Sequence, residues 1–508
     1  GRGSAAGSLV LNCLGCTNII DPIESRLLFE RFLDAERFRQ IVEAGGQVSG
    51  ADCPDVDSDW ATPMHDVVKR HFIDVYGERC TASIGTRGTM KTKAVLKDLA
   101  RLYDIPQAEI NAVTKGIDSE WADNEENEVT VADLEARSPE LKALLEKYPD
   151  FCRSFEEIRG TVSNWGVHAG GVLITDFDLT DQLPLRKDDD GRLVTCWTEG
   201  LSSRELGMMG FIKFDMLAID QINIIDDTLR LIKQTRGKDI DWTEIPLGDY
   251  KALNQLNKHD GICVFQFDTA LAAKVTDNMG GVKSFEDLGS LSTLMRPAAL
   301  QNGFDKEFGL RRAGKSDGYV PDCLKQYLAD TYGLPIYQEH IMQIAMALAG
   351  FDKVEAYSFM KKVYKGKVHG KEEKDEWRKK FVEGCRSKVE SGEIPADYPD
   401  RCFDQIMAFL GYGFCKSHAL SYSVYSALDL WLKAYYPLEF MCVNLSITDR
   451  AKEKKGVRLL DQRVRYCRSI GLKVSPADVR CSGDRWIIRD GGLIAPLSNL
   501  KGFGTNDV

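Results

Sequence analysis

Three aspartates at alternate positions, Asp55, Asp57 and Asp59, lie in the segment Pro54-Asp-Val-Asp-Ser-Asp-Trp60. In an extended strand, successive side chains point to opposite faces, so all three carboxylates would project from one side. Like charges held this close repel each other, and a fold tolerates them mainly when cations neutralise them. Such oxygen ligands suit Mg²⁺ or Mn²⁺ and the chemistry of phosphoryl transfer. A solvated edge strand or a run of Asx-turns would give the same pattern without a metal.

A second segment, residues 210–216, also alternates between two faces. Phe211, Lys213 and Asp215 fall on one face. The other face consists of apolar residues, Ile212, Phe214 and Met216. This pattern predicts a half-buried strand, in which Asp215 would join the metal-binding carboxylates and Lys213 would neutralise a phosphate. A surface pair of opposite charges would alternate in the same way.

The chain begins with small residues, Gly1-Arg-Gly-Ser-Ala-Ala-Gly-Ser8, followed by an apolar run. Glycine lets backbone N–H groups approach an anion closely, and a following helix N-terminus adds a favourable dipole. Arg2 and Ser4 would add further donors. The segment is therefore a candidate phosphate cradle, although a flexible tail has a similar composition.

Taken together, these segments resemble the palm and fingers of the bacterial DNA polymerase III alpha subunit, a C-family DNA polymerase. Other segments carry the same resemblance, in the family's order over essentially the whole chain. They are Leu27-Leu-Phe-Glu-Arg-Phe32, Gly88-Thr-Met90 with Lys93, His168-Ala-Gly-Gly171, Arg296-Pro297, Ile336-Tyr-Gln-Glu339, Gly411-Tyr-Gly-Phe-Cys-Lys-Ser-His418 and Leu430-Trp-Leu-Lys-Ala-Tyr-Tyr-Pro437.

The resemblance implies roles for individual residues. The catalytic, metal-binding carboxylates fall on Asp55, Asp57 and Asp215, with Asp59 as an additional acidic position. The residues that it assigns to nucleotide binding are Arg2, Gly3, Ser4, Arg31, Lys213, Lys361, Lys362, Lys416 and His418.

Three positions depart from the family's usual residues. Lys361 and Lys362 stand where the family usually has an arginine pair on the fingers, and lysine keeps the charge but loses the bidentate fork. Cys415 stands where the family usually has asparagine. His418 keeps the pattern, but a core or capping histidine would look the same in the sequence.

We therefore expect a DNA-directed DNA polymerase that extends a primer 3′ end by two-metal phosphoryl transfer during DNA replication. The expected cofactor is a pair of Mg²⁺ ions, with Mn²⁺ as a substitute. The expected partners are primer-template DNA, deoxynucleoside triphosphates and other replisome subunits or missing polymerase pieces. Two alternatives remain open: a non-catalytic polymerase-like subunit of a split replicase, and a metal-dependent phosphohydrolase.

The composition restricts the location and the binding partners that the chain could have. The chain has 508 residues, 43% hydrophobic and 28% charged, without a run of eighteen apolar residues or a signal-peptide pattern, so we expect a cytoplasmic protein and no membrane contact. The net charge of −11 is unusual for a nucleic-acid-binding protein. Basic residues are nevertheless concentrated locally, since residues 360–371 include five lysines and no acid. Cys13 and Cys16 form a CxxC without a second ligand pair nearby, so we do not expect zinc.

The expected fold class is α+β, with a nucleotidyltransferase-like mixed-sheet palm, a helical thumb and large helix-rich fingers. The predicted domains are palm residues 1–86, thumb 87–163, palm 164–220, fingers 221–492, and the start of a truncated helix-hairpin-helix region at 493–508. We also predict helices around 23–38, 64–76, 336–349, 419–434 and 456–470. The chain starts and ends inside motifs of the resemblance, so we expect a fragment, a processed product or one piece of a split polymerase, such as a phage might carry.

Overall fold

The computed structural model describes residues 1–17, 19–33, 35–46, 53–54, 56–123, 129–198, 206–207, 209–316, 318–364, 370–408, 414–448, 453–454 and 457–500. Helices and a mixed sheet make the fold α+β, as predicted. The chain divides into two compact units. The first comprises Gly1–Val48, Asp52–Val68 and Asp215–Val508, and the second comprises Ser49–Ala51 and Lys69–Phe214. The predicted domain boundaries remain a prediction.

The second unit contains a mixed sheet. Its strands are β2 (Thr81–Thr89), β3 (Val162–Ile174), β4 (Leu185–Lys187) and β5 (Leu193–Thr198). Strand β2 pairs antiparallel with β3 and parallel with β5, while β4 pairs antiparallel with β5. Ala82 and Ile84 of β2 bury their side chains with Leu173 of β3, because alternate residues of a strand face the same side. The short helix η5 (Leu179–Asp181) follows β3.

Helices between β2 and β3 form a separate core in the second unit. They are α4 (Thr92–Leu102), α5 (Gln107–Gly116), α6 (Ser119–Ala122), α7 (Val131–Arg137), α8 (Pro139–Lys147) and α9 (Pro149–Ile158). Local signals explain where they start: Thr130 and Asp133 form a capping box for α7, and Ser138 caps α8 before Pro139. Phe151 and Phe155 of α9 are completely buried in this core.

The start of the first unit differs in one respect from expectation. It contains η1 (Gly3–Gly7), α1 (Leu9–Cys13), η2 (Phe29–Arg31), α2 (Ala35–Glu43) and β1 (Asp57–Trp60). Of the helix predicted around residues 23–38, only the last part forms, at the start of α2. The turn that follows Asp21 ends at Arg26, whose φ of +49° lies outside the right-handed helical region. The helix predicted over 64–76 is confirmed as α3 (Thr62–Tyr76).

Most of the first unit is helical after β6 (Lys213–Ala218). The helices up to residue 331 are α11 (Asp220–Arg236), η6 (Trp242–Glu244), α12 (Tyr250–Asn257), α13 (Ala270–Asn278), α14 (Phe285–Leu294), α15 (Pro297–Gln301), α16 (Phe304–Arg312), α17 (Asp322–Leu328) and η7 (Ala329–Thr331). Those that follow are α18 (Gln338–Ala349), α19 (Lys353–Tyr364), α20 (Gly370–Gly384), α21 (Arg386–Glu390), α22 (Tyr398–Met407), α23 (Lys416–Tyr435), α24 (Pro437–Ile447) and α25 (Leu459–Ser469). The helices predicted over 336–349, 419–434 and 456–470 are thereby confirmed.

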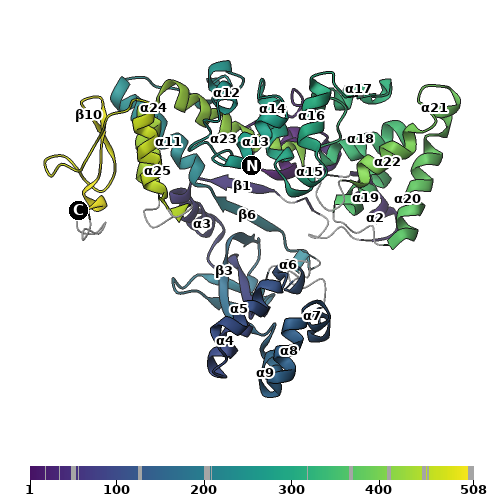
Figure 1. Ribbon diagram of the computed structural model, residues 1–508, viewed down its shortest axis with the longest axis horizontal. Helices are drawn as coiled ribbons and strands as arrows, with labels where there is room; N and C mark the ends of the chain where they lie inside the picture. Colours follow the sequence, from purple (N-terminus) through teal and green to yellow (C-terminus); the bar gives the residue numbers. More distant parts are fainter. Residues whose placement is uncertain are drawn as a thin grey trace. The chain divides into compact units, whose positions relative to one another are not determined.

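Helix α23 organises the first unit. It packs against α11, α12, α14 and α24, and it can be followed among them in Figure 1. Its Asp429 is fully buried and accepts hydrogen bonds from Gln221 Nε2 and the Phe265 N–H. One turn later, Lys433 Nζ donates to Asp260 Oδ1 at 2.6 Å and to the Ile262 carbonyl at 2.9 Å. These bonds attach the loop before α13 to the C-terminal half of α23.

Short strands complete the first unit. Strand β10 (Ile487–Arg489) pairs antiparallel with β11 (Gly492–Ile494), which pairs parallel with β9 (Val474–Ser475). Strands β7 (Glu453–Lys454) and β8 (Val457–Arg458) form a hairpin, and η8 (Leu497–Asn499) follows β11. Buried Trp486 and Leu493 belong to the same apolar core as α24.

An aromatic cluster formed by helices α19, α20 and α22 predicts a large loss of stability when one of its rings is removed. Phe359 is completely buried between the Trp377 ring at 5.1 Å and the Phe403 ring at 6.2 Å. Phe359→Ala should lower the free energy of unfolding by about 3–5 kcal/mol, because it removes buried contacts and leaves a cavity. Chemical denaturation measures this change. Tyr250→Ala, at a residue 72% exposed, should shift it by less than about 0.5 kcal/mol, and equal effects would contradict the assignment of this core.

Candidate active site

Strands β1 and β6 bring two distant acidic segments together in the first unit (Figure 1). They pair in parallel, with Asp57 opposite Asp215. Neighbouring strands are about 4.8 Å apart, and side chains in register on parallel strands leave the sheet on the same face. The Ser58 hydroxyl donates to the Asp215 carbonyl at 3.2 Å and reinforces this register. The two carboxylates therefore share one side of the strand pair.

The other two predicted acidic positions behave differently. Asp55 lies outside the described residues. Asp59 follows Asp57 on the same face of β1, but its Oδ1 lies 2.7 Å from Arg2 Nε and its side chain is only 1% exposed. Burial raises the pKa of Asp59, and the nearby Arg2 charge opposes this increase. Asp59 thus anchors Arg2 beside the acidic pair.

The predicted alternation around β6 is only partly correct. Met216 is buried, but Ile212 and Phe214 are 44% and 40% exposed, whereas Phe211 is buried. Phe211 and Ile212 lie before β6, which begins at Lys213, so they do not follow its alternation. Phe214 lies within the strand and is nevertheless exposed. Lys213 and Asp215 are both partly exposed and share one face of β6, as predicted.

The glycine-rich N-terminal segment lies against β1. The Arg2 N–H donates to the Asp57 carbonyl at 3.2 Å. Gly3 has φ +68°, which favours glycine, and a Cβ atom there would lie 3.8 Å from Asp57 Oδ2. Ser4 and the rest of η1 follow directly. The segment therefore brings backbone groups next to one of the two paired carboxylates.

His418 fixes this segment from the start of α23. The Gly3 N–H donates to His418 Nδ1 at 3.2 Å, and the Ser417 hydroxyl donates to the Gly3 carbonyl at 2.9 Å. The imidazole stacks on Tyr422 with ring centroids 4.4 Å apart. Burial, together with the charges of Arg2 and Arg296, lowers the pKa of His418 to about 4. The ring is therefore neutral at pH 7, with Nδ1 as an acceptor and the proton on Nε2.

The other predicted nucleotide-binding cations have different surroundings. Arg31 Nε donates to Gln338 Oε1 at 2.8 Å. Lys362 pairs with Glu373 at 2.6 Å. Lys361 is exposed, and its Nζ lies 5.6 Å from the centre of the Tyr357 ring. Of the predicted fingers pair, Lys361 is thus exposed, and Lys362 is half-buried beside a carboxylate.

Lys416 and Cys415 are buried at the N-terminus of α23. Lys416 is 8% exposed, with its Nζ 3.6 Å from Asp330 Oδ2. Burial and the nearby Glu339 carboxylate raise the pKa of Cys415 to about 12, so it remains a thiol. Its Sγ donates to Glu339 Oε1 at 3.2 Å. Cys415 therefore contributes a hydrogen bond within the protein, in the position where an asparagine was expected.

Sequence reasoning assigned no role to two residues beside His418. The Arg296 guanidinium lies 4.3 Å from the centre of the Phe414 ring, and burial lowers its pKa. Tyr422 lies under both the His418 ring and the Arg2 guanidinium, which is 5.4 Å from its centroid. The Arg296-Pro297 dipeptide was a visible signal for the first residue. Tyr422 lies one helical turn after His418, and that spacing was the available signal for the second.

The donor set fits a hard divalent cation. Asp57 and Asp215 supply carboxylate oxygens on one face of adjacent strands, the ligands that Mg²⁺ and Mn²⁺ prefer. Within the described residues, no group of three histidine, cysteine or acidic side chains is close enough to hold a metal ion, and Asp55 is not among those residues. Two of the three predicted ligands are thus brought together.

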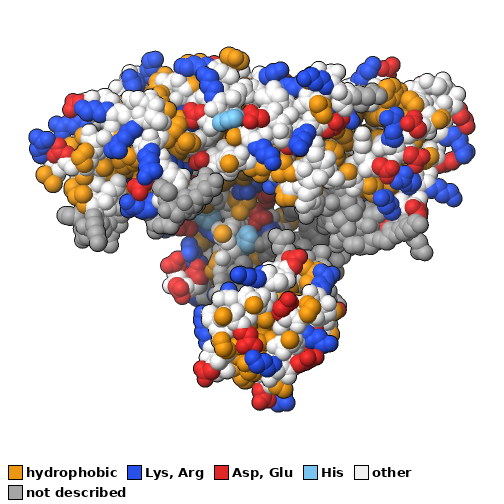
Figure 2. Space-filling model, viewed as in Figure 1, with side chains coloured by type: hydrophobic (Ala, Val, Ile, Leu, Met, Phe, Trp, Pro, Cys, Tyr) orange, Lys and Arg blue, Asp and Glu red, His pale blue; other side chains and the backbone are white. Residues whose placement is uncertain are grey.

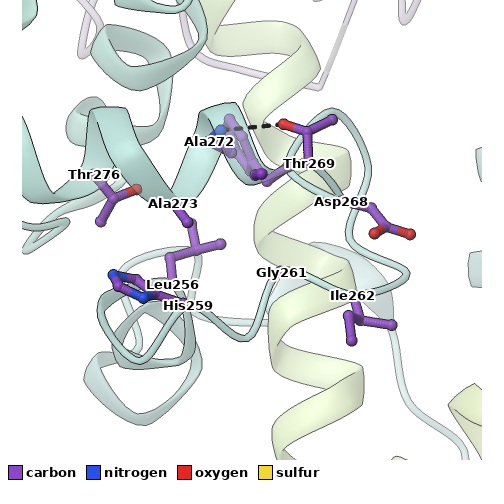
Figure 3. Close-up of a pocket in the computed structure, with 11 residues that line it drawn as sticks. Leu256, His259, Gly261, Ile262, Asp268, Thr269, Ala272, Ala273 and Thr276 are labelled. Carbon is purple, nitrogen blue, oxygen red and sulfur yellow. Dashed lines mark hydrogen bonds between the residues drawn. The ribbon is translucent and has the colours of Figure 1, made fainter. Parts of the chain in front are cut away.

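A pocket elsewhere in the first unit contains none of these residues. It has a volume of about 190 Å³ and lies where α12 is connected to α13 (Figure 3). His259 and Asp268 line it, and the Thr269 side chain caps the Ala272 N–H at 3.1 Å. The acidic pair therefore belongs to a different part of the unit from this pocket.

Surface charge is mixed. On the face shown in Figure 2, lysine and arginine side chains are interspersed with acidic ones. None of the helices in the described ranges is both long and apolar enough to cross a membrane.

Two family models match the chain. The model described as the bacterial DNA polymerase III alpha NTPase domain matches residues 1–218, which include Gly3, Asp57 and Asp215. The model described as the bacterial DNA polymerase III alpha subunit finger domain matches residues 221–389, which include Lys361 and Lys362.

Curated relatives match over nearly the whole chain. DNA polymerase III subunit alpha of Thermus aquaticus is 33% identical over 513 residues, covering 99% of this chain and 39% of the relative. The protein of the same name from Escherichia coli K12 is 33% identical over 524 residues, covering 100% of this chain and 42% of the relative. That of Bacillus subtilis is 31% identical over 515 residues. The chain thus spans about two fifths of the length of these relatives.

The lowered pKa of His418 predicts a pH-dependent stability. Its folded-state pKa of about 4 lies below the usual 6.5, so the unfolded chain binds the proton first as the pH falls. Stability should therefore be lost between pH 6.5 and about 4, by on the order of 2–3 kcal/mol from this group. His418→Gln keeps an acceptor for the Gly3 N–H but does not titrate. Denaturation at several pH values should show a shallower decline for His418→Gln, and identical slopes would contradict the buried neutral histidine.

Proposed function

Because this chain belongs to the bacterial DNA polymerase III alpha family, we propose that it adds deoxynucleotides to a primer 3′ end by template-directed, two-metal phosphoryl transfer. The observation that carries this proposal is the register of Asp57 with Asp215, next to the Gly3 backbone. Acidic oxygens on rigid strands beside a glycine-rich segment provide what phosphoryl transfer requires of a protein, namely positioning and charge neutralisation.

Asp57 and Asp215 would hold the divalent cations, together with Asp55. When bound, two Mg²⁺ or Mn²⁺ ions would activate the primer hydroxyl and stabilise the departing pyrophosphate. Asp59 would act through Arg2, since the carboxylate and the guanidinium are only 2.7 Å apart. No side-chain nucleophile is part of this proposal.

The triphosphate would lie along the glycine-rich segment, between backbone donors and side-chain cations. Gly3 and Ser4 would provide the backbone approach, with Arg2, Arg31 and Lys213 neutralising charge. His418 would contribute a hydrogen bond from Nε2 and no charge, because its ring is neutral. Lys361 would contact the triphosphate from helix α19. Lys416 would support the site from within the protein, given its burial beside Asp330.

The proposed substrates and partners follow from the same site. They are primer-template DNA and deoxynucleoside triphosphates, with other replisome subunits or polymerase pieces as binding partners.

Removal of either paired carboxylate should abolish nucleotide incorporation. Asp57→Ala or Asp215→Ala should reduce primer extension by about a thousandfold or more, because the cations lose ligands at the reacting centre. Primer extension with the four deoxynucleotides and Mg²⁺ measures this effect, and thermal melting checks the fold. Asp226→Ala, at an exposed carboxylate on α11, is the matched control and should extend normally.

The same assay separates the alternative functions. Retained extension by Asp57→Ala or Asp215→Ala would reject the assignment of these residues. A wild-type protein that binds primer-template but never extends it would be a non-catalytic subunit. One that only releases phosphate from nucleotides would be a phosphohydrolase.

The two neighbouring lysines of α19 should differ in effect. Lys361→Ala should raise the apparent KM for the incoming nucleotide about fivefold, since an exposed charge contributes on the order of 1 kcal/mol. Lys362→Ala should change it less, because Lys362 pairs with Glu373. Steady-state kinetics at saturating primer-template measures both values. An effect of Lys361→Ala on DNA affinity alone would contradict its nucleotide role.

A further inference from the structure

A buried carboxylate caps α23 from a different element. Glu339, the second residue of α18, is 2% exposed. The Lys416 N–H donates to its Oε1 at 3.0 Å and to its Oε2 at 2.8 Å. The Cys415 thiol donates to the same Oε1 at 3.2 Å. Glu339 therefore receives hydrogen bonds from both residues at the start of α23.

This contact replaces the usual local cap. Cys415 occupies the N-cap position, and its side chain makes no capping bond to α23. The first N–H groups of a helix have no intrahelical partners, and the helix dipole favours a negative charge beside them. Glu339 supplies both an acceptor and that charge. Its carboxylate also occupies a helix N-terminus that would otherwise attract phosphate.

The residues after Lys416 carry this constraint to the acidic pair. Ser417 and His418 bond the carbonyl and the N–H of Gly3, at 2.9 and 3.2 Å. Gly3 in turn lies against Asp57. A shift or fraying of the first turn of α23 would therefore move both atoms that hold Gly3.

The neighbouring Gln338 fixes a second part of the site. Its N–H donates to the Phe414 carbonyl at 2.9 Å, and its Oε1 accepts from Arg31 Nε at 2.8 Å. Two consecutive residues of α18 thus hold Arg31 on one side and the start of α23 on the other.

We propose that Glu339 is a positioning residue, whose carboxylate fixes the first turn of α23 and thereby holds His418, Ser417 and Gly3 in place for the incoming triphosphate. This inference deepens the proposed function and rests on it for the identity of the ligand. Glu339 touches neither substrate nor metal in this account. Its effect passes through the first turn of α23 and the side chains of Ser417 and His418 to Gly3.

Kinetics and hydrogen exchange test the proposal together. Glu339→Ala should raise the KM for the incoming nucleotide about tenfold or more, because small displacements of positioned groups are costly. The Kd for primer-template should stay within about twofold, because the groups that Glu339 positions are those assigned to the triphosphate. Hydrogen–deuterium exchange should become faster in residues 1–8 and 415–422. Glu339→Gln keeps an acceptor without the charge and should give an intermediate result.

Asp287 provides the matched control. It is 5% exposed in the same unit, accepts from the Lys283 and Ser284 N–H groups at the start of α14, and pairs with Arg312 at 2.8 Å. Asp287→Ala should lose comparable stability, without raising the nucleotide KM or loosening residues 1–8.

The outcomes are distinct. Equal KM increases for the Glu339 and Asp287 variants would mean a general structural effect and would overturn the proposal. Unchanged exchange in residues 1–8 for Glu339→Ala would overturn it as well. If the wild-type protein extends no primer, the proposed function fails, and hydrogen exchange alone then decides whether Glu339 positions Gly3.

Discussion

The parallel register of β1 with β6 is the constraint on which the site depends, because it holds Asp57 and Asp215 one strand spacing apart. Two carboxylates at that separation repel each other unless cations lie between them. A slip of one residue would turn one of them to the opposite face. The Ser58 bond to the Asp215 carbonyl and the Arg2 bond to the Asp57 carbonyl both oppose such a slip. The fold thus keeps two like charges close together, and the neighbouring hydrogen bonds hold the two strands in that register.

The groups around Gly3 are of two kinds, neutral hydrogen-bond partners and nearby cations. Its own polar atoms bond a neutral imidazole and a hydroxyl, so no fixed charge competes with an anion at the glycine itself. The cations are placed around it: Arg2 is held by Asp59, and Arg296 lies on an aromatic ring. Burial keeps His418 uncharged while Arg2 and Arg296 remain charged. The two states are compatible because both cations oppose protonation of the His418 ring.

Periodicity and local caps explain what could be predicted from the sequence. The strand with Asp57 and Asp59, the α3 helix and the long α23 helix each depend on near neighbours, and each was predicted close to its observed position. Contacts between distant residues could not be predicted in this way. The pairing of Arg2 with Asp59, the Glu339 bonds at Lys416 and the engagement of Lys362 with Glu373 require the tertiary fold. Alternation also gave a wrong prediction for Phe211 and Ile212, because a strand's two faces are defined only within the strand.

Helix α23 connects two parts of the chain that are far apart in the sequence. Its twenty residues extend about 30 Å, with Gly3 bonded at one end and the Asp260–Phe265 loop bonded to Asp429 and Lys433 nearer the other. A helix of this length, packed on several sides, moves as a stiff rod. Any rotation of the helix would displace the N-terminal glycine segment and the loop together, so a force on the loop would be transmitted to Gly3 and to the neighbouring Asp57.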